Sequence, residues 1–131
     1  MQISHIDHFV LTVKNVEETL FFYQCVLGMQ KVSFEDANGI SRNSLVFGSQ
    51  KINLHQAGKE FEPKAKAPTS GSADFCLITK TPMQDIISHM QTQNVKIEEG
   101  PIARTGAVGA INSIYIRDLD QNLIEISNYE T

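Results

Sequence analysis

The sequence predicts an α+β fold built from two tandem βαβββ modules, forming a cupped mixed sheet with its helices on the outer face. The order of elements read from hydrophobic periodicity is strand, helix and three strands, and this order then occurs a second time. Between the halves, residues 57–72 are rich in Gly, Pro, Lys and Ser and show neither period. We therefore expect one domain over residues 1–131, with modules at about 3–56 and 73–129 joined by a linker at 57–72.

The first module opens with a predicted strand, because Ile6, His8, Val10 and Thr12 alternate with Asp7, Phe9, Leu11 and Val13. Asn15 comes before Val16 and two carboxylates, which is typical of a helix start, and Gly28 marks the helix end. Three strands are expected at 30–35, 44–47 and 51–56, with turns at 36–39 and 48–50.

The second module repeats this order. Asp74, Cys76 and Ile78 alternate with apolar residues in a predicted strand, and Pro82 opens a helix. A short strand is expected at about 95–98, followed by a Gly-rich loop from 100 to 109. Strands at 113–117 and 122–127 flank a turn at 118–121.

Composition excludes several classes of protein. The net charge of −4 argues against a general binder of nucleic acid or of anionic membranes. No run of about 18 apolar residues is present, and the first residues do not resemble a signal peptide. The two cysteines are expected to be free thiols, so a cytoplasmic location is expected.

Four polar residues occupy equivalent positions in the repeat. A shift of 66 residues places His8 on Asp74 in the first strands, and a shift of 70 places His55 on Glu125 in the last strands. Their apolar neighbours along each strand have the opposite parity and should meet the helices. We therefore expect His8, His55, Asp74 and Glu125 to share the open, concave face.

Two imidazoles and two carboxylates suit one divalent transition metal such as Ni, Zn, Fe, Mn or Co. A metal of this kind can polarise two neighbouring substrate oxygens or acidify a bound water. Glu125 and His55 are the candidate catalytic residues, since a ligand that loosens can act as a general base. Three plainer interpretations remain open: His8 as a hydrogen-bonded strand histidine, His55 as a surface residue at a strand end, and Asp74 as a backbone cap.

Three further residues are candidates for substrate binding. Arg104 lies in the predicted Gly-rich loop, which could close on an anionic substrate group, although a solvated loop explains it equally well. Arg42 and Tyr115 could line the cavity, with surface or packing roles as the alternative.

Residues 6–13, 22–29 and 116–125 resemble the vicinal oxygen chelate superfamily, which includes glyoxalase I, extradiol dioxygenases, fosfomycin-modifying transferases and methylmalonyl-CoA epimerase. Residues 51–55, 60–65 and 98–101 resemble its glyoxalase-domain, virulence-associated subgroup. The resemblance implies metal ligands on the first and last strands of each module, and His8 and Glu125 match the commonest pattern. Leu119 and Gln121 replace the usual Pro and Gly of the turn.

Glyoxalase I usually has Glu at the position of His55 and His at that of Asp74, so this chain exchanges the two ligand types. The resemblance implies a glyoxalase-like, metal-dependent lyase or isomerase acting on a small substrate with vicinal oxygens. One alternative is an extradiol-type dioxygenase with Fe(II) at His8, His55 and Glu125. Another is a non-enzymatic small-molecule binding or resistance protein. A homodimer with shared sites is also expected, since pairing would cover strand edges.

Overall fold

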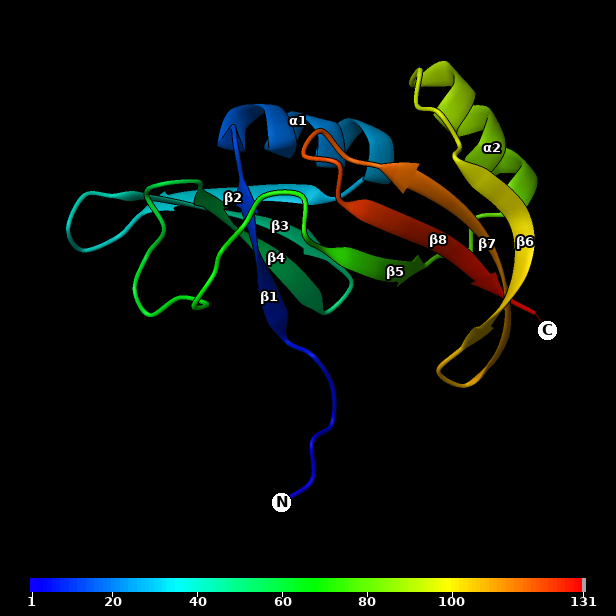
Figure 1. The fold of residues 1–131 in the computed structure, drawn as a ribbon, viewed down its shortest axis with the longest axis horizontal. Helices are drawn as coiled ribbons and strands as arrows, with labels where there is room; N and C mark the ends of the chain where they lie inside the picture. Colours follow the sequence, from blue (N-terminus) through cyan, green and yellow to red (C-terminus); the bar gives the residue numbers. More distant parts are fainter. Residues whose placement is uncertain (131) are drawn as a thin grey trace. The chain divides into compact units, whose positions relative to one another are not determined.

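The computed structural model describes residues 1–130, which form eight strands and two helices. The predicted α+β class and the two βαβββ modules are confirmed. Contacts divide the chain into an N-terminal unit, Met1–Ser70, and a C-terminal unit that begins at Gly71. Each unit contains one four-stranded mixed sheet and one helix (Figure 1). No helix within residues 1–130 has both the length and the apolar character that a membrane span requires.

The N-terminal unit comprises β1 (His8–Val13), α1 (Val16–Leu27), β2 (Gln30–Glu35), β3 (Ser41–Phe47) and β4 (Gln50–Gln56). Its strand order is β1-β4-β3-β2, and the first and last strands of the module pair in parallel. Helix α1 packs on one face of this sheet, where Leu20, Tyr23, Leu45 and Ile52 are almost completely buried. The core therefore lies between the helix and this face, which leaves the other face of the sheet open for polar side chains.

The C-terminal unit comprises β5 (Asp74–Ile78), α2 (Met83–Thr92), β6 (Glu99–Gly106), β7 (Gly109–Arg117) and β8 (Leu123–Tyr129). Its order, β5-β8-β7-β6, repeats that of the first sheet. Alternate residues of β7 and β8 are buried, among them Ile114, Ile116, Ile124 and Ile126. The opposite parity carries Ser113, Glu125 and Ser127, which share the other face of this sheet.

One region differs from the expectation. Residues 95–98, which were predicted to be a strand, are irregular, and the predicted Gly-rich loop at 100–109 is instead part of the long strand β6 and the turn into β7. Gly106 and Gly109 flank this tight turn, and a register shift between Glu99 and Ile102 marks a β-bulge. Glycines therefore shape a hairpin here, and Arg104 lies on a strand rather than in a mobile loop.

The predicted start of α1 is confirmed. The Asn15 side chain accepts a hydrogen bond from the Glu18 backbone N–H at 3.0 Å, and the helix ends at Gly28. We expect Asn15→Ala to lower the free energy of unfolding by about 1 kcal/mol, because this N–H loses its partner. Urea denaturation measures the loss. Gln24→Ala, at an exposed site in the same helix, should change stability by less than about 0.5 kcal/mol; equal effects would contradict the capping role.

Candidate functional site

The two histidines that were expected to share a metal both lie on the open face of the N-terminal sheet, but far apart along its strands. In the parallel β1–β4 pair, His8 lies opposite Lys51, and His55 lies opposite Thr12. The two histidines share a face but are four residue steps apart along the strands, or about 13 Å. Ligands of one transition metal each lie about 2 Å from it. The register therefore does not support His8 and His55 as ligands of one ion within one chain.

The same registers correct the alignment of the repeat. His8 lies opposite Lys51, and its equivalent Asp74 lies opposite Leu123. The last strands are therefore related by a shift of 72 residues (123 − 51), not 70. Asn53 is the structural equivalent of Glu125, two positions before His55. A slip of two residues preserves the face of every side chain, which is why the strand pattern did not reveal it.

His8 is oriented by its neighbour in the sequence. Its Nδ1 lies 2.8 Å from Oδ2 of Asp7, and the imidazole is about half exposed. The hydrogen bond to His8 lowers the pKa of Asp7, so the carboxylate stays charged and holds the imidazole proton at Nδ1. With Nδ1 engaged by this carboxylate, Nε2 on the other side of the ring is directed away from Asp7. Carboxylates commonly orient metal-binding histidines in this manner.

His55 lies in a pocket with a volume of about 310 Å³ on the open face of the N-terminal unit. Only 8% of the residue is exposed, and its ring meets the edge of Phe61 at a centroid distance of 5.1 Å. Burial, followed by the positive charge of Arg42, lowers the pKa of His55. The imidazole is therefore neutral at pH 7 and can accept a proton.

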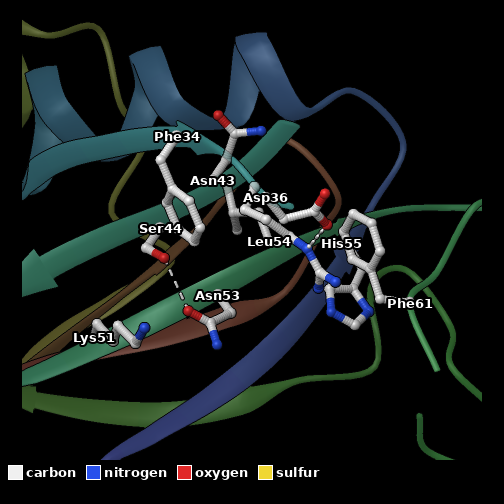
Figure 2. A pocket seen from close by; sticks show the side chains of 10 residues that line it. Phe34, Asp36, Asn43, Ser44, Lys51, Asn53, Leu54, His55 and Phe61 are labelled. Atoms are coloured by element: carbon white, nitrogen blue, oxygen red, sulfur yellow. Dashed lines mark hydrogen bonds and ion pairs between the residues drawn. The ribbon is translucent and has the colours of Figure 1, made fainter. Parts of the chain in front are cut away.

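Arg42 forms the cationic wall of the pocket. Its Nε donates to Oδ2 of Asp36 at 3.0 Å, and its guanidinium carbon lies 3.5 Å from the centre of the Phe61 ring. Asp36 accepts from the backbone N–H groups of Asn38 and Ile40 through its other oxygen. These backbone bonds and Arg42 lower the pKa of Asp36, which stays ionised and fixes the guanidinium. Figure 2 shows Asp36, His55 and Phe61 gathered at one end of the pocket.

Glu125 belongs to a row of hydrogen bonds on the open face of the C-terminal sheet. Its Oε2 accepts from Ser113 Oγ at 2.7 Å, Ser113 bonds to Ser127 at 2.6 Å, and Ser127 contacts Cys76 Sγ at 3.3 Å. Ser113 and Ser127 are completely buried, whereas Glu125 is partly exposed. The row fixes one carboxylate oxygen of Glu125.

Asp74 lies at the exposed start of β5, on the same face as Glu125. It is opposite Leu123, while Glu125 is opposite Cys76, so the two acids are offset by two residue steps, or about 7 Å, along the sheet. Within residues 1–130 no three His, Cys, Asp or Glu side chains are grouped closely enough to hold a metal. The four-residue metal site therefore stays a prediction.

Arg104 and Tyr115 form a contact of their own on the C-terminal sheet. Arg104 Nε donates to the Tyr115 hydroxyl at 3.0 Å, and its two terminal nitrogens bond to the Ala103 carbonyl and the Glu99 carboxylate. All three nitrogens of this guanidinium already have acceptors. Arg104 is thus less available to a substrate than the sequence suggested.

Several residues of these sites were missed in the sequence. Phe61 lies in the linker, where a single aromatic residue among Glu and Lys was the only indication of a packing role. Asp36 was assigned to a turn, which is correct, but its bond to Arg42 depends on how β2 and β3 pair. Asp7 and Ser113 hydrogen-bond to His8 and Glu125, and the alternation of apolar and polar residues along a strand does not indicate such contacts.

The family is decided by comparison with known proteins. The family model of the Glyoxalase/Bleomycin resistance protein/Dioxygenase superfamily matches residues 5–126. The chain belongs to this superfamily. The resemblance to the vicinal oxygen chelate group is thereby confirmed.

Relatives within this superfamily match nearly the whole chain. Virulence protein STM3117 of Salmonella typhimurium is 55% identical over 129 residues, which cover 98% of this chain and 87% of the relative. Glyoxalase domain-containing protein RDO1 of Mycosarcoma maydis is 48% identical over 130 residues, covering 99% and 71%. The integron cassette protein VCH_CASS1 of V. Cholerae has a solved structure with a TM-score of 0.93 and 57% identity, covering 99% and 98%.

Proposed function

We propose that this superfamily member is a glyoxalase-like lyase or isomerase that acts on a small substrate with vicinal oxygens and uses a divalent transition metal. The observation that carries this proposal is the orientation of two ligand-type side chains by supporting groups. Asp7 directs Nε2 of His8 outward, and Ser113 holds Oε2 of Glu125. We take His8 and Glu125 as the principal ligands, with Asp74 as an additional candidate.

The metal, when bound, would supply Lewis acidity toward neighbouring substrate oxygens. One imidazole and one or two carboxylates suit Mn, Fe, Co, Ni or Zn. Asp7 accepts the hydrogen bond from Nδ1 of His8, so that Nε2 is left to coordinate a metal. Ser113 occupies Oε2 of Glu125, so that Oε1 is available to an ion or to a substrate proton. His55, neutral and buried, serves as a separate proton acceptor in its own pocket.

Metal content of the untagged protein after reconstitution tests the assignment. We expect about one equivalent of a transition metal in the wild type, and less than about 0.2 equivalents in His8→Ala and Glu125→Ala. His55→Ala should retain its metal, because the β1–β4 register holds His55 far from His8. His89→Ala, on α2, is the control for histidine loss. A wild type that stays below about 0.2 equivalents would overturn the proposal.

The same variants test the proposed homodimer. If His8 and Glu125 of one site come from different chains, a heterodimer of His8→Ala with Glu125→Ala regains one intact site of two. Refolded mixtures should then bind metal although neither variant alone does. Mixtures that stay metal-free would show that both ligands come from one chain.

The extradiol alternative requires His8, His55 and Glu125 around one iron. The separation of His8 from His55 along β1 and β4 does not support that set within one chain. A non-enzymatic small-molecule binder remains the second candidate, and the pocket beside Arg42 and Phe61 favours it. Ligand binding that is metal-free and unchanged in His8→Ala would favour this second function.

A further inference from the structure

We propose that the pocket of the N-terminal unit is a binding site for a small monocarboxylate on a flat apolar body, and that it works without a metal. The pocket lies on the open faces of β2, β3 and β4, and Phe61 of the linker closes one side (Figure 2). Its volume of about 310 Å³ accommodates a compact ligand of this kind.

The guanidinium of Arg42 is held in place but only partly hydrogen-bonded. Its Nε is bonded to Asp36, and one face of its guanidinium is covered by Phe61. Among residues 1–130, no other acceptor is hydrogen-bonded to this side chain. The terminal nitrogens are therefore held in a fixed plane with their N–H groups unused. A planar carboxylate matches such a fork with two parallel hydrogen bonds.

The comparison with Arg117 shows that this state is specific to Arg42. Arg117 is similarly exposed, yet its Nε and one terminal nitrogen bond both oxygens of Glu98, and its other terminal nitrogen donates to the Gln121 carbonyl. In Asp36, by contrast, Oδ1 accepts from two backbone N–H groups, and only Oδ2 accepts from Arg42, at its Nε. The local structure positions the Arg42 guanidinium without saturating it.

The charges of the pocket indicate a monoanion. Arg42 and Lys51 are positive, Asp36 is negative, and His55 is neutral at pH 7 because burial and Arg42 lower its pKa. The lining thus carries an excess of one positive charge in a protein whose net charge is −4. A phosphate dianion would exceed this charge and would meet Asp36, whereas a single carboxylate balances it.

Two phenylalanines define the body of the ligand. Phe61 faces the pocket next to Arg42 and His55, and Phe34 on β2 is 54% exposed although it is a large apolar residue. An apolar ring or short chain between them would remove apolar surface from water while its acid group reaches Arg42. Ser44 and Asn53 bond to each other at 2.9 Å and form a polar floor between the walls.

Benzoate is the probe, and ¹⁵N-labelled protein kept metal-free with EDTA is the sample. We expect saturable amide shifts centred on Arg42, His55 and Phe61. Benzamide, which has the same shape without the charge, should bind at least about tenfold more weakly, as should inorganic phosphate. Because no metal is present, failure here is distinct from failure of the proposed metal site.

Variants complete the test. Arg42→Gln should weaken benzoate binding at least about tenfold, and Arg42→Lys, which keeps the charge but loses the fork, should weaken it too. Arg117→Gln is the matched control and should bind like the wild type. The amide spectrum checks the fold of each variant, and Arg42→Lys replaces Arg42→Gln if the latter unfolds. Equal binding of benzoate and benzamide, unchanged binding in both Arg42 variants, or shifts confined to other surfaces would overturn the proposal.

Discussion

Asp118→Ala is expected to lower the free energy of unfolding of the C-terminal unit by about 3–5 kcal/mol. Asp118 is 3% exposed and accepts from the backbone N–H groups of Asp120 and Asn122 at 3.0 and 2.9 Å. It also accepts from the Asn122 side chain at 2.8 Å. Alanine would leave these buried donors without their acceptor, and water cannot replace it at such low exposure.

Chemical denaturation measures this loss, with Leu119→Ala as the control. Leu119 lies in the same turn but is 52% exposed, so its truncation should cost less than about 0.5 kcal/mol. The Asn122 side chain also accepts from the Ala73 N–H, which ties the turn to the start of β5. The turn thereby fixes the position of β8 and of Glu125. An Asp118→Ala protein as stable as the control would contradict this role.

Gly100→Ala is expected to be destabilising by about 3–5 kcal/mol. Gly100 lies in the bulge of β6 with φ of +107°, a backbone conformation that residues with a side chain rarely adopt. A Cβ there would approach the Ser113 carbonyl oxygen to 2.4 Å and the Ile114 Cα to 3.0 Å. Both are backbone atoms of the neighbouring strand, so no side-chain rotation can relieve the clash.

Gly39→Ala is the control that distinguishes the strain of a positive φ from a steric clash of the added Cβ. Gly39 also has a positive φ, of +73°, but a Cβ added to it would meet no atom within 4 Å. Its replacement should cost only about 1–2 kcal/mol, the penalty of the left-handed conformation. The difference between the two variants in thermal or urea unfolding therefore measures the contact with β7. Equal losses would show that this contact is unimportant.

The fold could be predicted because its local rules agree with each other. Alternation marked the strands, Asn15 and Gly28 marked the ends of α1, and the repeated order of elements gave the two modules. The hairpin of β6 and β7 was missed because Gly106 and Gly109 were taken as evidence of a loop. Glycine also shapes tight turns within sheets, and residues 102–105 do not alternate between apolar and polar types in a way that would have marked the strand.

The sequence predicted which face of its sheet each candidate side chain occupies, but not how far along the strands it lies. Side-chain parity correctly placed His8 and His55 on one face, yet parity is unchanged by a slip of two residues. Only the observed pairing shows that Asn53, rather than His55, has the position in its own sheet that Glu125 has in the other. Contacts from outside the sheet, such as that of Phe61, depend on the path of an irregular segment, for which no period exists.

The parallel pairing of first and last strands has a consequence for how the chain acquires its structure. A ribosome releases β1 long before β4, and β5 long before β8, so each opening strand waits about 40 residues or more for its neighbour. The helix and the antiparallel hairpins can form early, because their contacts are local. The final step in each half is then a slow, non-local closure, and until it occurs the opening strand lacks the strand with which it pairs in the sheet.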